Sequence, residues 1–206
     1  LRSYFTKLYF HKIKKFDKYF LYCLHTQPEK STNIDAPEYI EEIKVIKRIS
    51  KYLPDNFYLY VKEHFHMNGK RRCSFYRKLK KIRGVKIISP NNDQFELLRN
   101  SIGTITVTGT IGLESSFLGK PYFCLGKTVF SKMCELEPEN NLSLFISNCI
   151  AGKYENNIFK KKLKDRSKCL VEALNRNSFD LDMDLIWTYK GTNHKIIERL
   201  KRASKI

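Results

Sequence analysis

Short apolar runs alternate with longer amphipathic stretches over much of the chain. The runs are four or five residues long and rich in β-branched and aromatic side chains, which is typical of buried strands. Turn-forming or polar residues follow each run, so each strand is expected to end in a loop. We expect strands at 20–24, 57–61, 85–88, 104–107 and 122–125.

Isoleucine and leucine recur at three- and four-residue steps after the first of these runs, at 40, 43, 46, 49 and 53. This spacing places them on one face of a helix. Pro37 suits the first helical turn and Pro54 lies beyond the last one, so we expect a helix over 37–53. Further helices are expected at 71–82, 93–100 and 111–118, with Asn92 or Asp93 as the cap of the second.

Strands that alternate with helices across short linkers indicate an α/β fold with a parallel, doubly wound sheet covered on both faces. We expect this domain to span residues 19–140, after a basic and aromatic connecting segment at 1–18. Residues 141–206 predict a mainly helical extension that packs on the domain. It contains a Lys-rich stretch at 160–168 and a final basic helix from Asn193.

The chain is strongly basic, with 39 Lys and Arg against 21 Asp and Glu, a net charge of +18 and a pI near 9.6. Such a charge favours polyanionic partners: nucleic acid, anionic lipid headgroups or phosphorylated ligands. Nucleotide bias in the coding DNA would produce the same excess of lysine. Acidic pairs such as Glu41 and Glu42 fall on predicted helix faces, where we expect them to be solvated.

The six cysteines form no C-x-x-C pair and no cluster with zinc-ligand spacing, so we expect reduced thiols and no bound metal. No apolar run reaches the roughly 18–20 residues that a membrane span needs, and no signal-peptide pattern is present. These features predict a soluble, cytoplasmic protein. Because the chain begins at Leu1, we also expect an upstream portion.

Polar motifs follow the predicted strands at their carboxyl ends, where ligands bind in parallel α/β sheets. The loop after the fourth strand contains Gly109 and Gly112, which let the backbone approach an anion at the start of the next helix. An ordinary strand-to-helix turn is the alternative. The loop matches neither the P-loop nor the dinucleotide fingerprint.

A cation, an acid and an imidazole follow the second strand, at Lys62, Glu63 and His64. Lys62 and His64 can both donate to a phosphate, and His64 can stabilise charge on a departing nucleotide. The alternative is a solvated loop. His66 is expected to be an exposed neighbour.

The motifs together resemble those of bacterial capsule and surface-polysaccharide biosynthesis glycosyltransferases, over roughly 19–130. They are His25-x-Gln27-Pro28-Glu29, Val61-Lys62-Glu63-His64, Ser89-Pro90, Thr108-Gly109-Thr110-x-Gly112-x-Glu114 and Gly119-Lys120-Pro121 with Gly126. The resemblance implies the C-terminal, donor-binding, Rossmann-like domain of a GT-B enzyme. Many relatives use CMP-linked acidic sugars such as Kdo or sialic acid, so CMP is favoured over UDP.

The resemblance also implies roles for individual residues. His64 matches the histidine of a His-Pro motif that contacts the donor phosphate, although Phe65 replaces the proline here. Glu114 matches an acid that meets the ribose. The remaining matched positions are a phosphate-binding loop at Thr108, Gly109, Thr110 and Gly112, base contacts at Ser89 and Pro90, and a cleft-facing motif at Gln27 and Glu29.

The implied reaction transfers a sugar from the nucleotide to a glycan or glycolipid acceptor, with Lys62 and His64 as the catalytic groups and without a metal or other cofactor. The general base of such enzymes usually lies in the other domain, which this chain is too short to contain. An N-terminal GT-B domain or subunit is therefore an expected partner. Basic helices would allow contact with an anionic inner membrane.

Two alternatives remain open at the level of sequence. One is a nucleotide-sugar epimerase of the UDP-N-acetylglucosamine type, which shares the architecture. The other is a non-enzymatic basic module that binds RNA or a membrane. The chain contains no RNP, KH or helix-turn-helix signature, so we expect no specific nucleic-acid partner.

Overall fold

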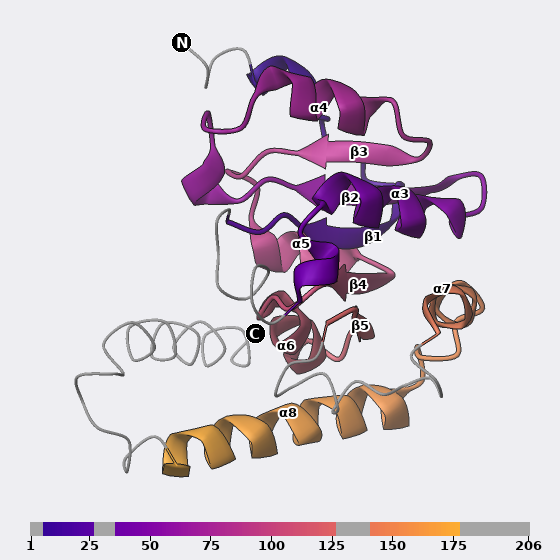
Figure 1. Ribbon diagram of the computed structural model, residues 1–206. Helices are drawn as coiled ribbons and strands as arrows, with labels where there is room; N and C mark the ends of the chain where they lie inside the picture. The colour runs from indigo at the N-terminus through magenta and orange to yellow at the C-terminus, as the bar shows by residue number, and fades with distance from the viewer. Residues whose placement is uncertain (1–5, 27–35, 127–140, 178–206) are drawn as a thin grey trace.

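The computed structural model describes residues 6–26, 36–126 and 141–177. Five strands form one sheet in the order β3-β2-β1-β4-β5, and each neighbouring pair is parallel (Figure 1). The prediction of a doubly wound α/β sheet is confirmed. The strands are β1 Lys18–Cys23, β2 Phe57–Lys62, β3 Val85–Ile88, β4 Gly103–Thr106 and β5 Tyr122–Cys124.

Helices alternate with these strands, as the spacing of apolar residues predicts. The α-helices are α3 Glu42–Lys51, α4 Cys73–Lys80, α5 Gln94–Asn100, α6 Ile111–Phe117, α7 Leu142–Ile150 and α8 Asn157–Asn177. Short 3₁₀ turns are η1 Lys7–Tyr9, η2 Pro37–Tyr39 and η3 Phe65–Met67. The side chain of Asp93 accepts a hydrogen bond from the backbone N–H of Glu96 and so caps α5.

Two of the predicted helices begin later than the apolar pattern indicates. The stretch at 37–53 divides into η2 and α3, and the stretch at 71–82 yields a regular helix only from Cys73. Glu42 and Arg71, near the starts of α3 and α4, are both buried and paired with each other. The later helix starts therefore lie beside a buried ion pair.

Alternate residues of the strands supply the cores on the two faces of the sheet. Phe20 and Tyr22 of β1 belong to a large cluster with residues of α3, α4 and α7, whereas Tyr19 and Leu21 join a smaller one with residues of α5 and α6. Because both faces are covered, apolar side chains point to both sides of the strands, as expected for a parallel sheet.

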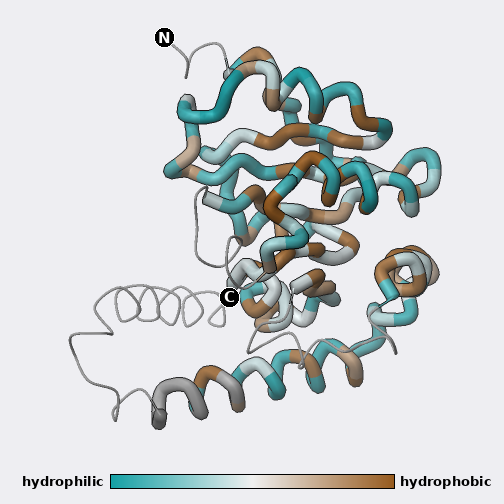
Figure 2. The backbone as a smooth tube through the Cα atoms, viewed as in Figure 1, coloured by the Kyte–Doolittle hydropathy of each residue, from teal (hydrophilic) through white to brown (hydrophobic). Residues whose placement is uncertain are grey.

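The C-terminal helices contact the sheet domain at its β5 side. Phe145 of α7 packs against Phe20 and Phe123, and Figure 2 shows that α7 is largely hydrophobic. The hydroxyl groups of Ser116 on α6 and Ser167 on α8 form a buried hydrogen bond. The helix expected from Asn193 lies outside the described residues. Within the described ranges, no helix is long and apolar enough to cross a membrane.

Candidate functional site

The carboxyl ends of β1, β2 and β4 meet at one edge of the sheet. Cys23 at the end of β1 pairs with Lys62 of β2, and Tyr22 pairs with Ile105 of β4. The chain runs outward from β1 to β2 and β3 and then returns to β4 on the other side of β1. Ligands of such sheets bind in the crevice at this reversal, so the loops after β1, β2 and β4 form the candidate site.

His25 and Thr26, which follow β1, lie between the glycine loop and His64. A Cβ atom placed on Gly109 would be 3.6 Å from Cε1 of His25. The hydroxyl of Thr26 is 3.2 Å from Nδ1 of His64. The structure thus brings His64 and the 108–110 loop to the same edge, on either side of the β1 loop. Sequence reasoning quoted His25 in a motif but gave it no role in the site.

One backbone contact indicates the tautomer of His64. The N–H of His66 donates to Nδ1 of His64 at 3.3 Å. Because a backbone N–H can only donate, Nδ1 is an acceptor and the neutral ring carries its proton on Nε2. Burial lowers the pKa of His64, as does the neighbouring His66. At neutral pH this side chain therefore offers one N–H donor.

His25 is also neutral at physiological pH. Burial lowers its pKa to about 4, and the charges of His64 and Arg71 act in the same direction. Its backbone N–H donates to Oε1 of Glu42 at 2.7 Å. The loop after β1 is thus held from below by a side chain of α3.

Lys62 is more buried than we expect of a side chain that donates to a phosphate. Its side chain is buried, and Nζ donates to the backbone carbonyl of Pro90 at 3.2 Å. Pro90 is itself buried, and Ser89 accepts a hydrogen bond from the N–H of Asn91 through its hydroxyl. Lys62 therefore joins the ends of β2 and β3.

Glu63 is not a solvated loop residue. Its carboxylate accepts hydrogen bonds from the backbone N–H of His64, from Nε of Arg71 and from the hydroxyl of Tyr76. Glu42, which we expected to be solvated, is buried and paired with Arg71. The expectation of solvation is wrong for Glu42, although it holds for the exposed Glu41, and the alternative of a solvated loop does not hold for Glu63. Lone charged residues near predicted helix starts gave no signal that they meet in space.

Gly109 in the loop after β4 and Gly112 in the first turn of α6 are glycines for different structural reasons. A Cβ on Gly112 would lie 2.6 Å from the buried ring of Tyr122, so packing of α6 on β5 requires a glycine there. Gly109 donates its N–H to the Thr106 hydroxyl at 3.0 Å, and a Cβ would meet that oxygen at 2.8 Å. Neither residue has a positive φ. A glycine is needed at position 109 because of the close contact with the Thr106 hydroxyl, not because of an unusual backbone turn.

The remaining predicted site residues are distributed unevenly. Thr108 is buried and Thr110 is exposed at the edge. Glu114 is buried and accepts a hydrogen bond from Nε2 of Gln94 at 2.5 Å. Gln27 and Glu29 lie outside the described residues. Across the described ranges, no group of His, Cys, Asp and Glu side chains is arranged to hold a metal ion.

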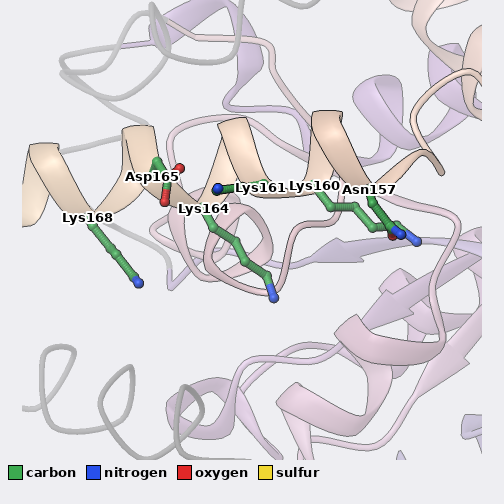
Figure 3. A pocket seen from close by; sticks show the side chains of 6 residues that line it. All are labelled: Asn157, Lys160, Lys161, Lys164, Asp165 and Lys168. Atoms are coloured by element: carbon green, nitrogen blue, oxygen red, sulfur yellow. The ribbon is translucent and has the colours of Figure 1, made fainter.

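A second polar feature lies on α8, away from the strand ends. Figure 3 shows a hollow lined by basic side chains of this helix. Its lining residues are Asn157, Lys160, Lys161, Lys164, Asp165 and Lys168. The predicted Lys-rich stretch therefore forms a cationic surface.

Comparisons with known proteins give one family and a group of solved structures. A family described as capsule polysaccharide biosynthesis protein matches residues 3–169. UDP-GlcNAc 2-epimerase from Neisseria meningitidis, solved with UDP-GlcNAc bound, is 19% identical with a TM-score of 0.45, over 80% of this chain and 46% of that one. The Methanocaldococcus jannaschii UDP-GlcNAc 2-epimerase is 21% identical with a TM-score of 0.46, over 83% and 49%.

The chain therefore spans about half the length of these solved proteins. No curated protein matches it.

Proposed function

The chain belongs to the capsule polysaccharide biosynthesis protein family, and from this premise we propose that it is the donor-binding half of a glycosyltransferase that uses a nucleotide sugar. The observation that supports this most is the meeting of His64, His25 and the 108–110 loop at the chain reversal of the sheet. Three separate loops thereby supply, at one edge of the sheet, an imidazole that can donate a hydrogen bond and a backbone that a ligand can approach closely. Such a combination suits a phosphate group.

The chemistry of the proposal follows from the neutral state of His64. An acceptor hydroxyl attacks the anomeric carbon while the bond from that carbon to the phosphate oxygen breaks. The electron pair of that bond remains on the phosphate, whose negative charge increases. The Nε2–H of His64 would donate to this oxygen. A preorganised donor lowers the barrier because its hydrogen bond becomes stronger as the negative charge on the oxygen develops. The acceptor's proton goes to a base supplied by the other half of the enzyme.

The rest of the nucleotide would extend from the phosphate along the same edge. The loop at 108–110 would contact the phosphate, Ser89 and Pro90 the base, and Glu114 the ribose. Since Glu114 already accepts a hydrogen bond from Gln94, a ribose hydroxyl would share the second acceptor capacity of its carboxylate. Lys62 would act through the position of Pro90 and through its positive charge. Gln27 and Glu29 complete the proposed set, with CMP favoured over UDP.

The proposal makes the chain one part of a two-part enzyme. A second domain or subunit would supply the general base and bind a glycan or glycolipid acceptor. The chain alone is therefore expected to bind the donor but to transfer little. We propose that the complete enzyme works in the cytoplasm.

The lysines that line the α8 hollow support a further contact, with the anionic surface of the inner membrane. Co-sedimentation with vesicles containing phosphatidylglycerol, weakened by salt and by charge reversal of Lys161 and Lys164, is expected. Binding that does not depend on anionic lipid would contradict this contact.

Calorimetry with CMP and UDP tests the donor site. The wild-type chain should bind CMP, and His64→Ala should weaken binding by about tenfold, the worth of one hydrogen bond to a charged group. His66→Ala is a matched control, because it removes the exposed neighbouring ring but leaves the backbone N–H. A folded wild-type chain that binds neither nucleotide would refute the proposal.

Product analysis separates the alternatives. Conversion of UDP-N-acetylglucosamine to its epimer without any acceptor would indicate an epimerase. Steeply salt-dependent binding of nonspecific RNA, without nucleotide binding, would indicate a basic RNA-binding module.

A further inference from the structure

A buried ion cluster lies directly below the two histidine loops. We call it the arginine clamp: Arg71, Glu42 and Glu63. Nη1 of Arg71 is 2.6 Å from Oε2 of Glu42, and Nε is 3.2 Å from Oε1 of Glu63. Their side chains are 7%, 2% and 0% exposed, respectively. The three residues come from the segment before α4, from α3 and from the end of β2.

Each member of the clamp also bonds the backbone of a histidine loop. Glu42 accepts from the N–H of His25 at 2.7 Å, and Nη2 of Arg71 donates to the carbonyl of His25 at 2.5 Å. Glu63 accepts from the N–H of His64 at 2.7 Å. One guanidinium group therefore connects the loops after β1 and β2, on which the two imidazoles stand.

The geometry requires arginine in particular. Arg71 serves two carboxylates and one carbonyl from three different nitrogens, and only a planar guanidinium presents donors in a fixed fork of this kind. Its plane also lies over the ring of Phe75, with Cζ 4.7 Å from the ring centroid. A lysine would keep the charge but lose the simultaneous contacts.

Stability alone does not account for such a cluster. Replacing a buried ion pair by apolar side chains is often neutral or stabilising, since desolvation offsets the attraction between the charges. Here the polar bonds end on the backbone of two loops at the carboxyl edge. These hydrogen bonds fix the position of the His25 loop relative to the His64 loop.

We infer that Arg71 is a positioning residue of the nucleotide site, which sets the spacing of the His25 and His64 loops through Glu42 and Glu63. This inference rests on the proposed function. A displacement of about 1 Å between binding groups is enough to change ligand affinity or rate by tenfold or more.

Arg71→Lys and the matched control Arg83→Lys test the inference. Arg83 pairs with the exposed Asp55 and donates to the carbonyl of Leu53, close to the opposite, amino end of β3. Amide exchange of His25 and His64 should become about tenfold faster in Arg71→Lys, because the carboxylates of Glu42 and Glu63 that accept from these two N–H groups are no longer held by the guanidinium. CMP should bind about tenfold more weakly. Arg83→Lys should leave both quantities within twofold of wild type.

The outcomes separate the inference from the proposed function. If Arg71→Lys lowers the melting temperature but binds CMP as wild type does, Arg71 is structural only and the inference is overturned. If the wild type binds no nucleotide, the proposed function and the positioning role fall together, whereas the exchange of the two amides still reports whether the clamp holds the loops.

Glu42→Gln serves if Arg71→Lys does not fold. The N–H of His25 and Nη1 of Arg71 donate to different oxygens of Glu42. In a glutamine one of these oxygens becomes an NH₂ group, which cannot accept, so at the present geometry one of the two contacts is lost. Faster exchange at His25 with weaker CMP binding supports the inference, and unchanged CMP affinity despite faster exchange contradicts it.

Discussion

At the scale of single residues, the backbone around His64 and His25 determines what the two imidazoles can do. The N–H of His66 makes Nδ1 of His64 an acceptor, which leaves Nε2–H as the group that a ligand meets. His25 is buried between this ring and Gly109. The site therefore combines a neutral donor at His64 with a buried neutral ring at His25, next to Gly109.

The low pKa of His25 predicts a pH dependence of stability. Below about pH 6.5 the unfolded chain protonates this residue, whereas the folded chain does so only near pH 4. The contribution of His25 to the free energy of unfolding is complete above pH 6.5 and is lost as the pH falls toward 4. It amounts to about 3 kcal/mol over that interval.

Urea unfolding of wild type and His25→Gln at pH 7 and pH 4.5 measures this contribution. The difference in free energy of unfolding between the two proteins should shift by about 2–3 kcal/mol from pH 7 to pH 4.5, in favour of the variant at the lower pH. A constant difference would mean that His25 is not held in its neutral form.

The sequence predicts that His64 and the 108–110 loop lie at one edge of the sheet, because strand ends are recognisable and the carboxyl ends of parallel strands meet. Sequence reasoning missed Arg71 and Glu42 because they are 29 residues apart and each resembles an ordinary solvated charge. Only the packing of α3 against α4 brings the two together. Long-range pairing of this kind leaves no periodic trace in one sequence.

At the scale of secondary-structure elements, α6 lies close to β5 because Gly112 has no side chain. The nearest ring carbon of Tyr122 would be 2.6 Å from a Cβ at this position. Tyr122 is buried, so moving its ring would disturb close-packed neighbours. The sequence indicated a ligand-contacting glycine, but helix-to-sheet packing already requires it.

Gly112→Ala is therefore expected to destabilise the chain by about 1–3 kcal/mol, the usual cost of overpacking. Combining it with Tyr122→Leu should relieve the clash, so that the double variant is more stable than the sum of the single effects predicts. Urea unfolding of the three variants checks this. Strict additivity would show that the glycine does not serve this contact.

The strands were predicted within one or two residues of their observed limits, since apolar runs bounded by polar loops are distinctive. Helix starts were less well predicted. The break between η2 and α3 comes just before Glu42, whose carboxylate is used by His25 and Arg71. Such tertiary contacts are not visible in the local helical pattern.

At the scale of the whole molecule, the topology creates the candidate site. The order β3-β2-β1-β4-β5 places the chain reversal between β1 and β4, and the motifs quoted from sequence follow these strands. The alternation of elements was sufficient to predict a parallel sheet, and the crossover rules limit its possible orders. How far each side chain at this edge is buried could not be predicted, because its burial depends on how segments far apart in the sequence pack together.

The central claim is that a nucleotide binds at this edge, and amide chemical shifts during titration with CMP test it most directly. The account predicts that the largest changes fall on His25, Thr26, His64, Gly109 and Thr110, with saturation as CMP is added. Changes confined to the lysine-lined hollow of α8, or no changes in a folded chain, would contradict it.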